Sequence, residues 1–226
     1  MVYDADRFES FLQLLPHSTD AALELARRHA QRLEGRSWLG PIDDQPMRHA
    51  FEIRHASFAT PAFIDQLRRH RVSLVVADTA GKWPLLEDVT ADFVYVRLHG
   101  DKELYASGYG QAALQDWARR IDAWRGGGQV ADARVVVARQ PSRKRRDVYC
   151  YFDNDVKVHA PYDARSLAAM LGAQNDQRVP ERAPDADQLP PPRLRAPRMT
   201  RGASKQSSKQ SREQPKEAQK ERRRAT

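Results

Sequence analysis

The chain has 226 residues and a formal net charge of +8, from 38 Lys and Arg against 30 Asp and Glu. No apolar run approaches the roughly 18 residues of a membrane-spanning helix, and the acidic first residues predict no secretory signal. The single cysteine, Cys150, excludes an internal disulfide framework and a cysteine-based zinc site. These features predict a cytoplasmic protein without membrane contact.

Two helices are predicted at the start of the chain. The first is predicted over residues 6–15, which have an apolar face, and this helix ends at Pro16. The second is predicted over residues 19–33, with Glu24 and Arg28 paired one turn apart. Its inward residues are predicted to be Ala22, Leu23, Ala26, Ala30 and Leu33.

Strands and helices then alternate. Strands are predicted at residues 49–55, 72–78, 93–99 and 147–153, with a minor strand at 135–137. Helices are predicted from Thr60 onward, over residues 114–124 and over residues 163–171. This alternation predicts parallel strands joined by right-handed crossovers, as in a doubly wound sheet or part of a (β/α)8 barrel.

Residues 173–226 differ sharply from the rest of the chain. They contain 14 basic and 7 acidic side chains, many Pro, Ser and Gln residues, and few large apolar residues, whereas residues 1–172 contain 24 basic and 23 acidic side chains. Such a composition predicts a disordered basic tail after a folded domain of residues 1–172. The tail either stays solvated or makes weak, salt-sensitive contact with nucleic acid or an acidic partner. The basic run 143–146 leaves the same choice between a solvated loop and an anion site.

Polar side chains gather at the carboxyl ends of the predicted strands, where parallel α/β proteins place their sites. Glu52, Asp78 and His99 are the catalytic candidates, since carboxylates and imidazole serve as general acids or bases. The ligand-binding candidates are Arg54, His55, Arg97, Tyr105, Tyr109, Asp153 and Asn154. Two alternatives stay open: Glu52 and Arg97 form a structural ion pair, and the two tyrosines only cover the rim.

Several of these segments, in this order, resemble the domain-of-unknown-function family 72, also called YecE-like. They are Phe51–His55, Ala77–Asp78, Tyr95–Gly100 with Tyr105 and Tyr109, Trp117, Val148–Asp155, Ala160–Pro161 and Ala164. The resemblance extends over about residues 6–171 and implies a TIM barrel of unestablished activity. Family members begin with about four further β/α units, so the resemblance implies that residues 1–172 correspond to strands five to eight.

The expected fold is therefore α/β, a partial TIM (β/α)8 barrel that needs its missing half or a partner for closure. The expected function is a polar site for an anionic or sugar-like ligand, with no metal assigned, no cofactor identified and the question of catalysis open. The alternatives are a non-catalytic module whose basic tail binds nucleic acid or an acidic partner, and an inactive fragment.

Overall fold

The computed structural model describes residues 1–156 and 158–173. The chain divides into two units, Met1–Leu189 and Pro190–Thr226, and every described residue belongs to the first. The expected tail, residues 173–226, lies outside the described residues apart from Ala173, and the domain boundary at residue 172 stays a prediction.

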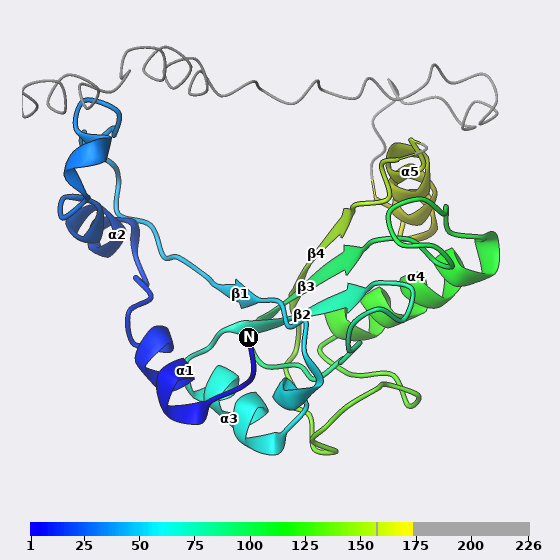
Figure 1. The fold of residues 1–226 in the computed structure, drawn as a ribbon. Coiled ribbons are helices and arrows are strands. Elements are labelled where there is room, and N and C mark those ends of the chain that lie inside the picture. The colour runs from blue at the N-terminus through cyan, green and yellow to red at the C-terminus, as the bar shows by residue number, and fades with distance from the viewer. Residues whose placement is uncertain (157, 174–226) are drawn as a thin grey trace, which may run out of the picture. The chain divides into compact units, whose positions relative to one another are not determined.

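The described chain contains four strands and five α-helices (Figure 1). In chain order the elements are α1 (Ala5–Leu12), α2 (Thr19–Ala26), the 3-10 turn η1 (Gln31–Leu33), β1 (Ala50–Phe51), the 3-10 turn η2 (Ala56–Phe58), α3 (Pro61–Arg69), β2 (Ser73–Asp78), β3 (Phe93–Leu98), α4 (Gln111–Arg125), β4 (Asp147–Phe152) and α5 (Ala160–Met170). β2 leads to β3 through a loop without a helix. None of the helices within the described ranges is long and apolar enough to cross a bilayer.

The four strands form one parallel sheet in the order β1-β2-β3-β4, which confirms the predicted parallel α/β arrangement. The register places Ala77 of β2 beside Arg97 of β3, and Arg97 beside Tyr151 of β4. Equivalent ends of the strands therefore lie along the same edge. The sheet has a carboxyl edge, after Asp78, Leu98 and Phe152, and an amino edge, before Ser73, Phe93 and Asp147.

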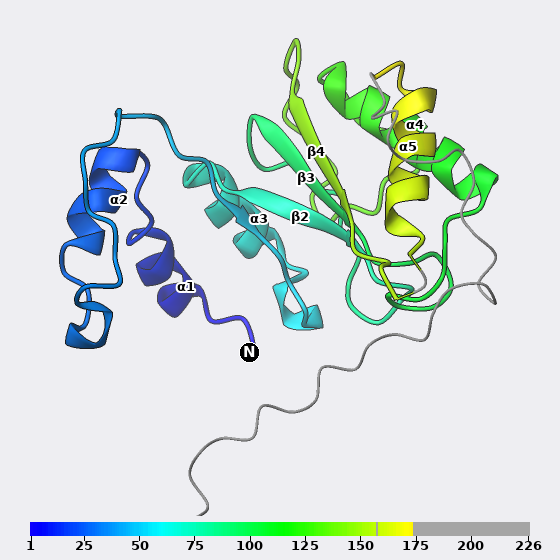
Figure 2. The same cartoon turned by 90° about the horizontal axis from the view of Figure 1, so that it is seen from above.

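Helices pack on one face of this sheet (Figures 1 and 2). One apolar cluster joins Val76, Val94, Val96 and Leu98 to α4 and α5, where Trp124 is fully buried. These side chains alternate along each strand with those of the opposite face, because successive residues of a strand point to opposite sides. The opposite face carries Phe93, Tyr95, Arg97, Tyr149, Tyr151 and Asp153.

A second apolar cluster lies at the other end of the sheet. Phe8 and Leu12 of α1 pack there with Phe63, Ile64 and Leu67 of α3, with Val72 just before β2, and with Leu74 of β2. Thr60 begins α3 as predicted, since its hydroxyl accepts a hydrogen bond from the backbone N–H of Phe63, and Pro61 follows as the first helical residue.

The predicted second helix is too long. α2 ends at Ala26, none of its residues is buried, and the residues Ala26, Ala30 and Leu33 that were expected to face inward are exposed. A short helix without a packed face has little tertiary stabilisation, so apolar spacing alone does not extend it. Glu24 also pairs with Arg27 rather than with Arg28.

Two strand predictions also fail. The strand expected over residues 49–55 has only two residues, Ala50 and Phe51, because the chain turns from the sheet toward η2. Residues 135–137 form no strand: the carboxylate of buried Asp88 accepts the backbone N–H groups of Val136 and Val137, at 2.8 and 2.9 Å. A side chain thus satisfies donors that a neighbouring strand would otherwise bind.

Candidate functional site

Charged side chains from three strands meet at the carboxyl edge of the sheet. Glu52 follows β1, Arg97 belongs to β3, and Asp153 follows β4. With His99, which follows β3, they form what we call the strand-end cluster. The parallel register brings these residues together from positions up to 101 residues apart in the sequence.

Arg97 lies at the centre of the strand-end cluster. Its Nη1 donates to Glu52 Oε2 at 2.5 Å, and its Nε donates to Asp153 Oδ2 at 2.8 Å. Arg54 Nε donates to the other oxygen of Glu52 at 2.9 Å. The ion pair between Glu52 and Arg97 that the sequence left as one alternative is therefore present, within a longer chain of charges.

Burial and pairing act in opposite directions on the pKa values of this cluster. Desolvation disfavours the charged carboxylate of Glu52, but hydrogen bonds from Arg54 and Arg97 outweigh it and lower the pKa. Desolvation likewise disfavours the Arg97 cation, and the hydrogen bonds to Glu52 and Asp153 outweigh it and raise the pKa. Both groups are therefore charged at neutral pH.

His99 is fully buried. Its Nδ1 lies 3.5 Å from Asp153 Oδ2, outside hydrogen-bond geometry, and neither ring nitrogen has a hydrogen-bond partner among the described residues. Desolvation, followed by the charge of Arg97, lowers the pKa of His99. Tyr105, at a positive φ of 64°, packs its ring edge-to-face against His99 with centroids 5.3 Å apart.

Asp78 and Tyr109 belong to a neighbouring buried network. The Tyr109 hydroxyl donates to Asp78 Oδ2 and accepts from the backbone N–H of Gly100, both at 3.1 Å. Asp163 Oδ2 accepts from the Tyr109 backbone N–H at 3.0 Å and from Asn154 Nδ2 at 2.8 Å. Burial raises the pKa values of Asp78, Tyr109 and Asp163. This network holds the loop between β3 and α4 against β2 and α5.

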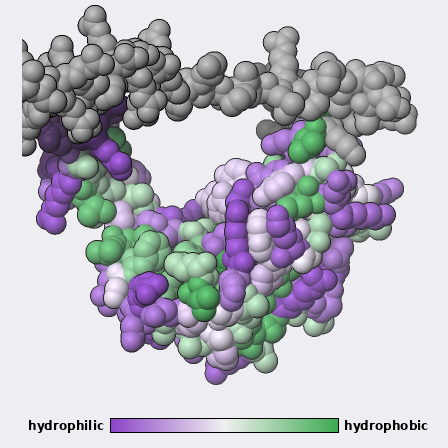
Figure 3. Space-filling model, viewed as in Figure 1, coloured by the Kyte–Doolittle hydropathy of each residue, from purple (hydrophilic) through white to green (hydrophobic). Residues whose placement is uncertain are grey.

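On the opposite face of the sheet no helix of residues 1–156 and 158–173 packs, and we call it the helix-free face. Beyond it lies a cavity of about 700 Å³, which we call the inner cavity. Its lining residues are Arg48, Ala50, Glu52, Val75, Phe93, Tyr95, Arg97, Tyr149, Tyr151 and Asp153. The rings of Tyr95 and Tyr151 stack with centroids 5.1 Å apart and planes 18° apart, and Tyr151 is 49% exposed. Figure 3 shows hydrophilic purple and pale residues over much of the sheet region.

The structure divides the candidates of the sequence into three groups. Glu52, Arg97 and Asp153 line the inner cavity, and Arg54 reaches them through Glu52. Asp78 lines a different cavity, of about 400 Å³, beside α4. The remaining candidates lie away from the inner cavity lining: His55, His99, Tyr105, Tyr109 and Asn154.

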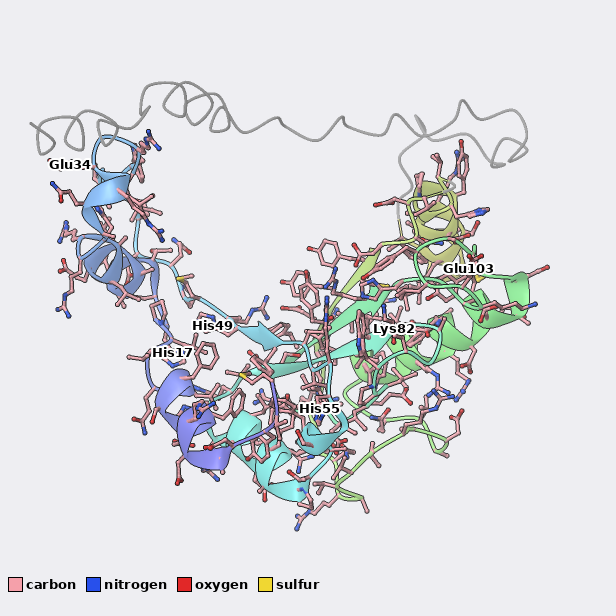
Figure 4. The ribbon with its side chains drawn as sticks, in the orientation of Figure 1. His17, Glu34, His49, His55, Lys82 and Glu103 are labelled. Carbon is pink, nitrogen blue, oxygen red and sulfur yellow. The ribbon has the colours of Figure 1, made fainter. Side chains whose placement is uncertain are left out.

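His55, labelled in Figure 4, has a local structural contact. Its Nδ1 accepts the backbone N–H of Ser57 at 3.1 Å, which caps η2. Asn154 is fully buried and donates to Ser107 O and Asp163, while its Oδ1 has no hydrogen-bond partner among the described residues.

Sequence reasoning did not assign Tyr95, Tyr151 or Trp83 to the site. The two tyrosines were detectable, because strand alternation places Tyr95 on the same face as Arg97 and Tyr151 on the same face as Asp153. Trp83 carried no such signal: it lies in the loop after β2, where the Arg54 guanidinium stacks 4.3 Å from its ring centroid. Across residues 1–156 and 158–173, no group of three or more His, Cys, Asp or Glu side chains could hold a metal ion.

The fold and the site together define an α/β protein with helices packed on one face of a parallel sheet and charged side chains at its carboxyl edge. The sequence model of the family described as "Protein of unknown function DUF72" matches residues 2–188, so the chain belongs to this family. No curated protein is similar enough to this chain to count as a match.

Crystal structures of DUF72 family proteins are similar to parts of this chain. One from Thermotoga maritima MSB8 is 23% identical, with 56% of this chain and 47% of that chain covered and a TM-score of 0.46. Two from Enterococcus faecalis V583 are 17% and 18% identical, with TM-scores of 0.46 and 0.41. They cover 60% and 57% of this chain, and 51% and 50% of theirs. The chain spans about half the length of these structures.

Proposed function

We propose that the inner cavity binds a neutral, sugar-like ligand. The observation that carries this proposal is the complete pairing of Arg97 between Glu52 and Asp153. The cavity has two cations, Arg48 and Arg97, and two carboxylates, Glu52 and Asp153, so its formal charge is zero.

This charge balance favours one of the two ligand classes that the sequence left open. An anion would have to compete with two carboxylates for Arg97 and would itself lie close to them. A polyhydroxylated ligand donates its hydroxyls to Glu52 and Asp153 and accepts from Arg97 without disturbing either ion pair. The exposed ring of Tyr151 offers an apolar surface for the C–H face of a sugar.

The architecture that we propose around this ligand is a (β/α)8 barrel in which β1 to β4 are strands five to eight. The helix-free face of the sheet then becomes the barrel interior, and the carboxyl edge becomes part of its mouth. In the part of the chain that the structure describes, the helices pack on one face and the exposed tyrosines lie on the other, which supports this arrangement. A partner or a further segment of chain supplies the remaining strands.

The experiment is isothermal titration of the full chain with glucose, galactose, mannose and xylose, and separately with inorganic phosphate and citrate. We expect one or more sugars to bind, and Tyr151→Ala to weaken that binding about tenfold through the lost ring contact. Tyr162→Ala on α5 is the matched control, because Tyr162 does not line the inner cavity.

Two results would overturn the proposal. The first is binding of the anions, lost on Arg97→Gln, without binding of any sugar. The second is a sugar affinity that Tyr151→Ala leaves unchanged. Thermal unfolding of each variant without ligand shows whether a loss of binding reflects a loss of folding.

A further inference from the structure

A second large cavity, of about 880 Å³, lies at the amino edge of the sheet, opposite the strand-end cluster. We call it the basic cavity. Its lining residues are His17, Pro46, Met47, Arg48, His49, Arg68, Arg71, Thr90, Ala91, Asp92, Pro141 and Arg143. Segments just before each of the four strands contribute to it, and His17 and His49 are labelled beside β1 in Figure 4.

The basic cavity carries an excess of positive charge. Of the described residues, four guanidinium groups line it against one carboxylate, that of Asp92, with the imidazoles counted as neutral. The inner cavity has equal numbers of arginines and carboxylates, although Arg48 lines both. The basic cavity therefore has unbalanced charge that an anion can neutralise.

The hydrogen bonds show which guanidinium groups are available. Arg48 pairs with Asp147 at 2.8 Å. Arg68 donates only to uncharged acceptors, the backbone oxygens of Val89 and Arg139 and the side-chain oxygen of Gln140. Among residues 1–156 and 158–173, the side chains of Arg71 and Arg143 have no hydrogen-bond or ion-pair partner. Their guanidinium N–H groups are therefore available to donate hydrogen bonds to a ligand.

Backbone contacts fix the positions from which these two side chains extend. The Arg143 backbone N–H donates to Gly127 O at 3.3 Å, and a Cβ on Gly127 would lie 1.6 Å from Arg143 O. Gly127 is also at a φ of 82°, so only glycine fits there. The backbone N–H of Arg71 donates to Arg68 O at 3.2 Å, just past the end of α3.

We propose that the basic cavity binds an oligophosphate, such as inorganic triphosphate or the phosphate chain of a nucleotide. Guanidinium groups match phosphate oxygens bidentately, and several of them converge here with little carboxylate to neutralise them. The volume is within the range of small-ligand sites. The described residues of the lining include no Phe, Tyr or Trp ring for base stacking, so the phosphates supply the recognition.

The test is isothermal titration of the full chain with inorganic triphosphate and, in parallel, with ATP in the absence of divalent metal. We expect Arg71→Gln combined with Arg143→Gln to weaken triphosphate binding at least tenfold. The matched control combines Arg36→Gln with Arg145→Gln, which removes the same charge from exposed arginines outside the cavity lining. All four arginines are exposed, so thermal unfolding without ligand is expected to be unchanged.

The outcomes separate the sources of the ligand. Equal affinities for triphosphate and ATP support recognition of the phosphates alone, and tighter ATP binding supports a nucleotide as the source. Equal losses in the two double variants would overturn the proposal, because they indicate general surface charge. So would a 20-base-pair DNA duplex that binds through Arg71 and Arg143 and is not displaced by triphosphate.

Discussion

The two edges of the same parallel sheet differ in whether their arginine side chains are paired with carboxylates. At the carboxyl edge, Arg97 contacts two carboxylates and the inner cavity has no net charge. At the amino edge, Arg71 and Arg143 contact no carboxylate among the described residues and the basic cavity is positive. We infer that unpaired guanidinium donors, rather than the number of arginines, determine which edge favours an anion. Experiments that apply the same change or the same condition to both edges test this inference.

The largest expected effect is on stability, at the carboxyl edge. Arg97→Met leaves Glu52 and Asp153 without their shared cation, with side-chain exposures of 13% and 31%. Because the cluster is only partly buried, we expect a loss of about 2 kcal/mol in the free energy of unfolding, less than for a fully buried pair. Arg71→Met at the amino edge is expected to cost less than about 0.5 kcal/mol. Urea unfolding measures both, and equal losses would contradict the comparison.

The next largest effect is expected from salt concentration, which should change ligand affinity differently at the two edges. The proposed oligophosphate is held by exposed charges, so its affinity is expected to fall about tenfold between 0.05 and 0.5 M NaCl as screening increases. A neutral sugar in the inner cavity should change its affinity less than about twofold, because no net charge attracts it. Titrations at both salt concentrations measure this, and parallel losses at the two edges would show that both ligands bind through net charge.

Arg48 lines both cavities and therefore tests whether they are independent. Its guanidinium lies 4.7 Å from the Phe93 ring centroid and 5.3 Å from that of Tyr149, and it pairs with Asp147. Arg48→Gln is expected to cost about 1 kcal/mol of stability through these exposed contacts. We expect it to weaken oligophosphate binding about threefold and to leave sugar binding within twofold. Arg145→Gln is the control, and a larger loss for the sugar would contradict the assignment.

The smallest expected effect is a pH dependence at the carboxyl edge. Burial lowers the folded-state pKa of His99 below its unfolded value near 6.5, so the unfolded chain binds more protons as the pH falls below that value. His99 therefore lowers the free energy of unfolding as the pH falls from 7 toward its folded-state pKa. His99→Leu should remove this contribution, while His17→Gln at the amino edge should retain it. Urea unfolding at pH 5, 6 and 7 measures the slope, and an unchanged slope in His99→Leu would rule out this origin.

The three longer strands were the most predictable part of the fold. β2, β3 and β4 begin and end within one residue of the predicted ranges, because continuous or alternating apolar runs dominate their packing. α2 and β1 were predicted too long, since apolar spacing says nothing about whether a packing surface lies opposite. The failed strand at residues 135–137 depends on the Asp88 carboxylate, a contact 48 or more residues away that no local pattern contains.

The two sites also differ in how far the sequence predicted them. Polar strand ends pointed to Glu52, Arg97 and Asp153, because parallel strands bring their carboxyl ends to one edge. The sequence did not indicate the basic cavity apart from the run that contains Arg143, since its arginines come from α3 and from loops before different strands. Nor could the sequence show which arginines are neutralised, because pairing depends on side-chain distances across the sheet.

β2 contributes to both apolar clusters of the described structure. Its Val76 packs with β3 and α4, whereas Leu74, two residues earlier, packs with α1 and α3. For folding, this makes β2 the element through which two otherwise separate cores become cooperative. If α1 or α3 detaches, one end of the six-residue strand β2 loses its packing contacts. The other end of β2 is paired with β3. The two cores are therefore expected to open in a coupled sequence, with β2 among the last backbone segments to exchange its amide hydrogens.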